Sequence, residues 1–405
     1  MTQTVCGIDV HRDTLVATII DENTQQPQTR EFQNSLTDIQ HLKTWLKLHQ
    51  CNQAVMESTS IYWIALYLSL EETGFKPVLA NAHQVKGIPG RKTDQSDSQW
   101  LAYLLRAGLI KPSYVPAKHL RELRELTRLR VKYVQNRTQF KNRCQKVLNR
   151  VNIRLGSKLS DVFGKSGMEV LKGLMAGKTV ESILEDTQNK YLKTKKEEIS
   201  EVAKGALSEN DIFVLQELTQ SIENLNIQIH KIDVRMETLA NQHDVAVICS
   251  VPGVGRLSAA TVLAELGDVS RFSNGKQVAS WSGLAPSVCQ SAGVTVFGGI
   301  TKQGSRWLRR IMVEVAHVAV RTPGRFRQMF LRITAKKGKK TAFVAVARKM
   351  LTIIWHLLVN GEKYVEDGFS KVSIKVKSSY RGHVPLETMV EVLRNAGYTV
   401  TANNG

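Results

Sequence analysis

Four acidic residues that lie far apart in the sequence have the local settings of a divalent-metal site. Asp9 interrupts a β-branched apolar stretch, and Glu57 directly follows the short apolar run 53–56. Asp94 and Asp97 are three residues apart at an expected helix start, so their carboxylates share one face about one turn apart. Carboxylates this close repel each other unless a cation lies between them, and Mg²⁺ takes oxygen ligands of this kind. Paired Mg²⁺ ions can hold both oxygens of a displacement at phosphorus, and this is the chemistry that the set predicts.

Each of these acids also has an ordinary structural interpretation. The two helix acids could form a solvated, acid-rich helix start, where the helix dipole favours anions. Asp9 could cap the end of a strand, and Glu57 could begin the next helix. Asp13 and Asp21 are expected to be turn residues. The order in which the four acids fall along the predicted elements favours the metal site.

The elements around the acids predict a mixed sheet flanked by helices. Trp100, Leu101, Leu104 and Leu105 have helical spacing, which extends a helix beyond the last acid. This order of elements is that of the ribonuclease H-like nuclease fold, in which acids on the first strand, at the end of a later strand and on a following helix converge. The expected elements are two strands in 5–20 around a turn at 11–14, a strand near 28–33, a helix at 37–49, a strand at 53–56, a helix at 60–73, a strand at 76–81 and the helix that carries the last two acids.

Length and composition limit the class of protein. A chain of 405 residues with 42% hydrophobic residues predicts two or three domains with real cores. No apolar run is expected to span a bilayer, and the first residues enter a strand pattern instead of a signal sequence. The five cysteines are scattered and form no Cys-x-x-Cys pair, which favours a reducing cytosol over a zinc or disulfide framework.

The net charge of +20 predicts a polyanionic partner. Residues 118–154 hold twelve basic residues against two acidic ones, and residues 302–349 hold fourteen against one. Either block could be a solvated face, but two blocks of this density favour phosphate backbones. We expect the first block to contact RNA and the second to contact DNA. The predicted nucleic-acid contacts are Arg121, Arg124, Arg128, Arg137, Lys141, Lys302, Arg306, Arg309 and Arg310.

Two long helices are expected in the middle of the chain. The first, at about 117–155, is strongly basic, and glycine-punctuated helical sequence follows to about 210. In the second, apolar residues alternate steps of three and four, which is the seam of a coiled coil. Pairing with the first helix of the same chain and pairing between protomers both remain open. The seam residues are Leu215, Leu218, Ile222, Leu225, Ile229, Ile232, Met236 and Leu239.

A glycine-rich C-terminal region supplies candidate nucleophiles. The Pro-Gly-Val-Gly turn at 252–255 enters a small-residue helix and resembles a helix-hairpin-helix element, which presents backbone N–H groups to phosphate. A glycine- and hydroxyl-rich loop at 285–304 then leads into a basic helix from Ser305. A serine hydroxyl needs a base or metal to become a good nucleophile. From the residues alone Ser282, Ser287 and Ser291 are all candidates.

Together these motifs resemble those of a known family over about residues 5–358. The family is the Piv/MooV-type DEDD transposases of the insertion sequence one-ten family, the bridge-RNA-guided recombinases. Relatives often have glycine after the motif serine, where this chain has Ala292. The motifs are Gly-Ile-Asp at 7–9, Glu-Ser-Thr at 57–59, Lys-Thr-Asp-Gln-Ser-Asp at 92–97, Ser-Gly-Leu-Ala-Pro at 282–286, Gln-Ser-Ala-Gly at 290–293 and Gly-Gly-Ile-Thr-Lys-Gln-Gly-Ser-Arg-Trp-Leu-Arg at 298–309.

The resemblance implies a fold and a reaction. An α/β RuvC/RNase H-like domain (1–112) would precede a basic helix and coiled-coil arm (113–243) and a mainly α-helical transposase domain (244–360), with an appendage at 361–405. Ser291 would attack a DNA phosphodiester and form a phosphoserine link. The four acids that would hold Mg²⁺ are Asp9, Glu57, Asp94 and Asp97.

The resemblance also implies partners and a location. The serine and the acids of one site would come from different protomers of a dimer or tetramer, which would hold target and donor DNA. A structured noncoding bridge RNA would give specificity, and the protein would act in the bacterial cytoplasm at the nucleoid, without a membrane. Two rival hypotheses are a RuvC-like endonuclease that uses water and a non-catalytic nucleic-acid-binding protein whose acids are structural.

Overall fold

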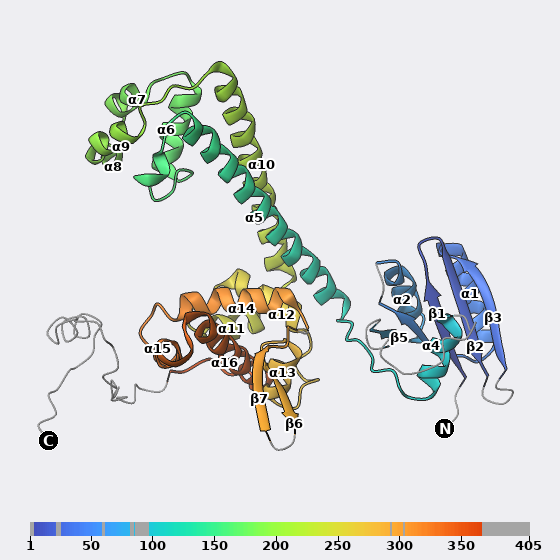
Figure 1. Cartoon of the computed structure of the whole chain (residues 1–405). Coiled ribbons are helices and arrows are strands. Elements are labelled where there is room, and N and C mark those ends of the chain that lie inside the picture. The colour runs from blue at the N-terminus through green and yellow to red at the C-terminus, as the bar shows by residue number, and fades with distance from the viewer. Residues whose placement is uncertain are drawn as a thin grey trace, which may run out of the picture.

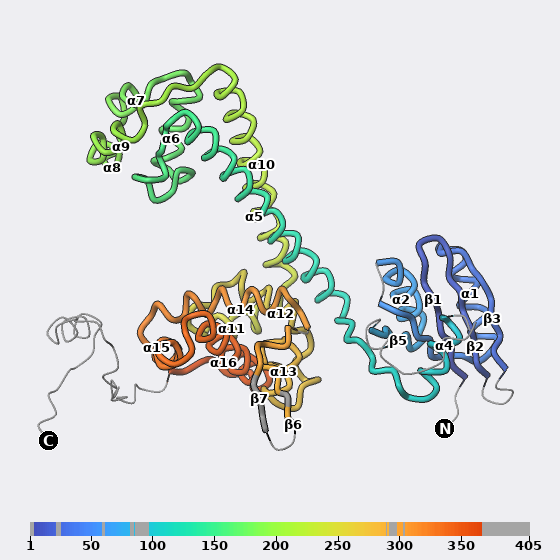
Figure 2. Tube along the Cα trace, in the orientation of Figure 1, coloured from blue at the N-terminus to red at the C-terminus, as the bar shows by residue number. Residues whose placement is uncertain are grey.

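The computed structural model describes residues 4–21, 26–58, 61–81, 85, 97–291, 294–302 and 304–366. The chain forms an N-terminal sheet domain, a long two-helix arm with a small helical tip, and a helical C-terminal domain that carries a β-hairpin (Figure 1). The tube in Figure 2 shows that the chain travels out along one arm helix and back along the other before it enters the C-terminal domain. In the expected appendage at 361–405, the sequence also predicts a strand near 372–376 and a helix near 385–396, and both lie outside the described residues.

The N-terminal domain is a five-stranded mixed sheet in the order β3-β2-β1-β4-β5. β2 pairs antiparallel with β1 and β3, while β4 pairs parallel with β1 and β5. This topology is that of the ribonuclease H-like fold, and it confirms the predicted α/β class. The elements are β1 (Val5–Val10), β2 (Thr14–Ile20), β3 (Pro27–Gln33), α1 (Leu36–Leu48), β4 (Gln53–Glu57), α2 (Trp63–Glu72), β5 (Lys76–Ala80) and α4 (Asp97–Arg106).

The two faces of this sheet carry different helices. Cys6, Ile8 and Val10 of β1 face a core that includes apolar residues of α1 and α2. The alternate residues of β1 face α4, which lies so close that a Cβ on Gly7 would be 2.0 Å from the carbonyl oxygen of Ser98. Glycine at this position therefore allows α4 to lie directly on the first strand.

The arm consists of α5 (Lys118–Arg150) and α10 (Glu209–Leu239), which pack along each other within the chain (Figure 1). Most of the predicted seam faces inward: Leu215, Ile222 and Ile229 are buried. Arg130 Nε lies 2.5 Å from Asp233 Oδ1, and Arg150 pairs with Asp211 near the far end. In this structure, α5 of the same chain therefore covers the apolar seam of α10.

The tip of the arm has a small core of its own, which sequence analysis described only as glycine-punctuated helix. Cys144 and Leu148 of α5 and Leu215 and Ile222 of α10 contribute to it, so the tip is continuous with the arm. The tip elements are η1 (Leu155–Ser157), α6 (Lys165–Met175), α7 (Val180–Asp186), α8 (Lys190–Thr194) and α9 (Lys196–Val202).

The C-terminal domain packs its helices around α16. Val346, Met350 and Ile354 of α16 lie in a core shared with α11, α12 and α14. Of the described helices, α16 alone has the length and apolar composition of a membrane span, a test that core helices also pass. The sequence predicted no such run, because Arg348 and Lys349 interrupt it. The helices are α11 (Gln242–Cys249), α12 (Arg256–Leu266), α13 (Gly275–Trp281), α14 (Arg306–Ala319), α15 (Arg325–Lys337) and α16 (Lys339–Asn360).

Part of the predicted serine loop is a β-hairpin, formed by β6 (Pro286–Ser291) and β7 (Val294–Ile300). The glycines and hydroxyl residues here predicted a loop. The β-branched and aromatic residues between them, such as Val288, Val296 and Phe297, favour strands. Val288 pairs with Phe297 and Cys289 with Val296 across the hairpin, and the register shifts between Pro286 and Val288. The segment is therefore a paired hairpin with one irregular step, where a loop was expected.

Candidate active site and its basic surroundings

Strand pairing places Asp9 and Glu57 at one edge of the sheet. In the parallel pair β1–β4 the last matched residues are Ile8 and Met56, so each acid follows one residue later on neighbouring strands. Ile8 and Met56 both face the α1–α2 core, so the alternation of side chains turns both acids to the α4 face. The register therefore puts both acids at the same edge of the sheet, and their role as metal ligands stays a prediction.

The first residue of α4 is Asp97, and α4 runs antiparallel to β1. Ser98 lies against Gly7 and bonds to Thr18, with 2.8 Å between the hydroxyl oxygens. One turn later, Ala102 packs with Val5 and Ile20 at the other end of the strands. The start of the helix therefore points toward the sheet edge that carries Asp9, and it brings a third acid there.

The carboxylate of Asp9 has a partner that sequence analysis treated only as a turn residue. His11 Nε2 lies 3.0 Å from Asp9 Oδ2, and this imidazole is largely exposed. Among the described residues, no three acidic, histidine or cysteine side chains lie close enough together to hold a metal ion. Asp94 lies outside the described residues. The donors at this edge are carboxylate oxygens at the ends of neighbouring strands, which are suitable ligands for a hard cation. The His11 side chain would have to move away before Asp9 Oδ2 could bind such an ion.

The three candidate serines differ in their surroundings. Ser282 is buried at the end of α13, and its hydroxyl donates to the Ala279 carbonyl over 2.9 Å. The Ser287 hydroxyl donates across the hairpin to the Gly299 carbonyl over 3.0 Å. Ser291 is the last residue of β6 and pairs with Val294 at the hairpin tip. Internal hydrogen bonds therefore hold the hydroxyls of Ser282 and Ser287.

An open basic groove of about 490 Å³ lies between the end of β7 and one face of α14. Lys302, Arg306 and Arg310 line it, together with His317. Arg309 also lines it, and its guanidinium donates to the carbonyls of Ser282 and Gly304. Burial lowers the pKa of this arginine. The groove concentrates positive charge next to the hairpin, with Glu314 as its acidic lining residue.

Known proteins match both ends of this chain. Residues 6–153 match a transposase family model of the DEDD IS110 type, and residues 245–330 match the model of the transposase IS116/IS110/IS902 family. The transposase for insertion sequence element IS1111A of Coxiella burnetii is 23% identical over 370 residues, which cover 89% of this chain and 91% of that protein. The pilin gene-inverting protein of Moraxella bovis is 24% identical over 371 residues, which cover 88% of this chain and 96% of that protein.

The chain belongs to the IS110 family of transposases. It is therefore an enzyme that acts on DNA as a transposase or recombinase, and DEDD membership is consistent with use of a divalent metal. Among solved structures, RuvC of T. thermophilus in complex with Holliday junction substrate aligns at 13% identity and a TM-score of 0.22, over 27% of this chain and 99% of the RuvC chain.

In this IS110-family transposase, the arginines at the start of α5 contact other parts of the same chain. Arg121 pairs with Glu71 of α2 at 3.2 Å. Arg124 donates to the carbonyls of Ala264 and Glu265 at the end of α12, and burial lowers its pKa. Further along the arm, Arg137 donates to Asn226, while the ammonium of Lys141 lies 4.9 Å from the ring centre of Phe163. The role of these four side chains in nucleic-acid binding stays a prediction.

Glu265 is a functional candidate that the sequence analysis missed. Its carboxylate is almost fully buried and accepts two hydrogen bonds from Arg128, at 2.8 and 3.0 Å. The Ser305 hydroxyl donates to the same carboxylate over 2.7 Å and also caps the start of α14. The signal in the sequence is one acid inside the otherwise apolar end of α12, because a buried carboxylate needs partners. Glu265 therefore links the arm to the helix that lines the basic groove.

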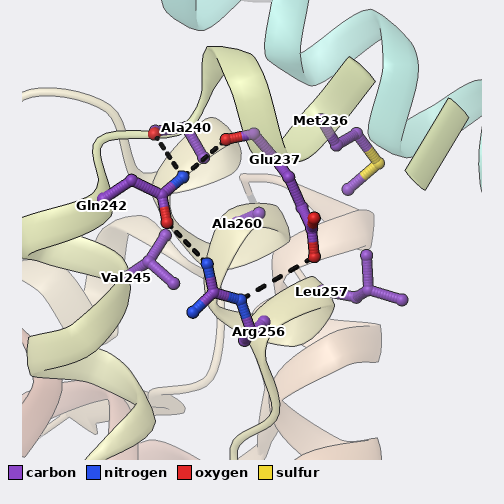
Figure 3. Close-up of a pocket in the computed structure, with 8 residues that line it drawn as sticks. All are labelled: Met236, Glu237, Ala240, Gln242, Val245, Arg256, Leu257 and Ala260. Carbon is purple, nitrogen blue, oxygen red and sulfur yellow. Dashed lines mark hydrogen bonds and ion pairs between the residues drawn. The ribbon is translucent and has the colours of Figure 1, made fainter. Parts of the chain in front are cut away.

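A second polar cluster fixes the other arm helix (Figure 3). Arg256, at the start of α12, donates to Gln242 Oε1 over 2.6 Å and lies 3.8 Å from Glu237 Oε1 of α10. The Gln242 amide in turn donates to the carbonyls of Glu237 and Ala240. These contacts brace the corner where α10 ends and α11 begins. Both arm helices are thus attached to α12.

Proposed function

We propose that this transposase mobilises its own insertion sequence by cutting and rejoining DNA through Ser291. The Ser291 oxygen forms a bond to phosphorus while the bond from phosphorus to the neighbouring nucleotide breaks. The departing oxygen takes a proton and leaves as the hydroxyl of the cut strand. A hydroxyl from another strand then attacks the phosphoserine, which restores a phosphodiester and frees the serine. The covalent link conserves the bond energy, so strand exchange needs no ATP.

The observation that carries this proposal is the placement of Asp9 and Glu57 at the ends of two neighbouring strands, with α4 beginning at Asp97 toward the same sheet edge. With Asp94 they would hold Mg²⁺, which supplies charge stabilisation at a phosphoryl oxygen and lowers the pKa of a bound hydroxyl. With the ion bound, these carboxylates would hold it where a phosphodiester could bind. Lys302, beside the hairpin, would contribute positive charge to the crowded transition state.

Nucleic acids would occupy the basic surfaces. The groove beside the hairpin suits the backbone of target or donor DNA, because Lys302, Arg306 and Arg310 gather there. We propose that a structured bridge RNA selects the DNA and contacts the basic arm. The functional units would be residues 1–112, 113–243, 244–360 and 361–405, acting in the cytoplasm of a bacterium at the nucleoid.

The site would be composite and formed by a dimer or tetramer. Figure 1 shows the β6–β7 hairpin and the N-terminal sheet in separate parts of the molecule, with the whole arm between them along the chain. The hairpin of one protomer would therefore meet the acids of another. This supports the family expectation that each active site takes its serine and its acids from different chains.

The decisive experiment is capture of the covalent link. We expect the wild-type complex with RNA, DNA and Mg²⁺ to give a protein–DNA adduct that survives denaturant. Protease digestion of the protein should free the DNA, and the adduct should contain phosphoserine at 291. Ser291→Ala should give no adduct and no cutting, whereas Ser287→Ala should retain both. Continued cutting by Ser291→Ala without an adduct would instead support a RuvC-like endonuclease that uses water.

A further inference from the structure

The chain that leaves the N-terminal domain is bonded to the edge of its sheet. Pro112 forms an antiparallel bridge with Ala80 of β5, and the Ser113 N–H donates to the Leu79 carbonyl over 2.7 Å. These bonds extend the sheet edge by a short backbone segment. The N-terminal domain therefore fixes the chain as far as residue 113.

The next residue is already anchored on the C-terminal domain. The Tyr114 hydroxyl accepts a hydrogen bond of 2.8 Å from the Asp268 N–H, just after α12. The Tyr114 ring covers Gly267, whose φ of +71° turns the chain there; a Cβ on this glycine would lie 2.6 Å from the ring. No residue separates the anchor on the sheet from the anchor on the C-terminal domain.

An arginine completes the second anchor. The Arg271 guanidinium lies 3.9 Å from the ring centre of Tyr114, 4.0 Å from that of Phe272 and 4.2 Å from that of Trp281. It also donates to the Leu266 carbonyl over 3.0 Å. Stacking on three aromatic rings, with a hydrogen bond to the end of α12, keeps this guanidinium in one place. Tyr114 thus packs against a rigid surface.

The first turns of α5 repeat the pattern. Arg121 reaches back to Glu71 of the N-terminal domain, while Arg124, one turn later, reaches the carbonyls at the end of α12. The side chain of Arg121 also donates to the Pro116 carbonyl. The start of α5 therefore contacts both the N-terminal and the C-terminal domain, shortly after Tyr114 in the chain.

We propose that Tyr114 is a positioning residue that fixes the acid-bearing domain relative to the hairpin of the same chain. The consequence of this positioning depends on the proposed function. In that function, each protomer presents its acids to the hairpin of a partner and never to its own hairpin. The Arg121–Glu71 pair is part-exposed and would restrain the N-terminal domain only weakly. Without the Tyr114 anchor, the domain would therefore swing about residues 112–117, and the partner geometry of the composite site would be lost.

Distances between the two domains test this joint without any chemistry. Spin labels would be attached through azide-bearing amino acids that replace two exposed residues, Leu48 of α1 and Val359 of α16. The labelled protein would be diluted in excess unlabelled protein. We expect one narrow distance distribution for the wild type and a several-fold broader one for Tyr114→Ala. Insertion of Gly-Gly-Ser between residues 113 and 114, which leaves both anchors in place, should broaden it as well.

Matched variants separate positioning from folding. Tyr114→Phe keeps the ring over Gly267 and Arg271, so it should retain the narrow distribution. Tyr191→Ala, at the exposed arm tip, removes a tyrosine without touching the joint and should do the same. Melting temperatures of all variants should match, because the cores are unchanged. Wild-type distances in both Tyr114→Ala and the insertion variant would overturn the proposal.

The reaction gives a second readout. We expect strand exchange to fall at least tenfold in Tyr114→Ala and to recover in Tyr114→Phe. Ser291→Ala should abolish exchange yet leave the distance distribution unchanged. If the serine mechanism is wrong, the adduct assay alone would show it. If the proposed role of Tyr114 is wrong, the distance distributions alone would show it.

Discussion

Strand register positions Asp9 and Glu57. Each follows the last matched pair of β1 and β4, and buried residues on either side fix which face it takes. A slip of one residue would turn both acids into the α1–α2 core, which a charged carboxylate opposes strongly. The sheet thus places two of the four proposed metal ligands before any ligand is present.

At the residue scale, the acids should bind metal in a way that is measurable without DNA. We expect Mg²⁺ to raise the melting temperature of the wild type, because a ligand at about 100 times its Kd stabilises the folded state by about 2.7 kcal/mol. Asp9→Asn should lose this shift, as measured by scanning calorimetry. Asp13→Asn is the control, since that acid pairs with Arg12 in the turn. An equal shift in both variants would place the ion elsewhere.

At the scale of elements, Gly7 determines how closely α4 approaches β1. We expect Gly7→Ala to displace α4, because the new Cβ would lie 2.0 Å from the Ser98 carbonyl oxygen and 2.5 Å from the Ala102 nitrogen. Asp97 would move with the helix, so strand cleavage should fall at least tenfold, about 1.4 kcal/mol in barrier height. Gly156→Ala, where a Cβ would meet Val162 at an ordinary 3.8 Å, should cleave at the wild-type rate.

The buried carboxylate of Glu265 also acts between elements. We expect Glu265→Gln to destabilise the chain by about 2–3 kcal/mol, somewhat below the 3–5 kcal/mol of a fully buried pair, because Arg128 is 40% exposed. Urea unfolding would measure this change. Glu314→Gln removes an exposed i,i+4 pair with Arg310 and should cost under about 0.5 kcal/mol. Equal losses of unfolding free energy in the two variants would mean that the burial of Glu265 does not contribute to stability.

The sequence predicted local elements better than their partners. Strands β1 and β2 follow from runs rich in β-branched residues and β4 from a short run bounded by polar residues, and the positions of Asp9 and Glu57 follow from those strands. The Glu265 contacts could not be predicted in this way, because Arg128 lies 137 residues away and no local period links the two. Tyr114 gave no signal either, since its hydrogen-bond partner lies 154 residues away. Long-range polar contacts depend on the assembled fold, and they define the joints of this molecule.

At the scale of the whole molecule, the basic charge separates into two kinds. Arg124 and Arg128 at the base of the arm are used to dock α5 on the C-terminal domain. Lys302 and Arg306 instead line an open groove. The net charge of +20 therefore overstates the surface that is available to nucleic acid, and the groove becomes the stronger candidate for a phosphate backbone.

A composite site predicts that two inactive proteins restore each other. Asp9→Asn supplies an intact Ser291, and Ser291→Ala supplies intact acids, so a mixed oligomer contains some sites with both. We expect each variant alone to be inactive in strand exchange and their equimolar mixture to recover a clear fraction of wild-type product. The double variant mixed with Ser291→Ala is the control, because no intact serine is present. Inactivity of the equimolar mixture, with mixed oligomers verified by differently sized tags, would place the serine and acids of one site in the same chain.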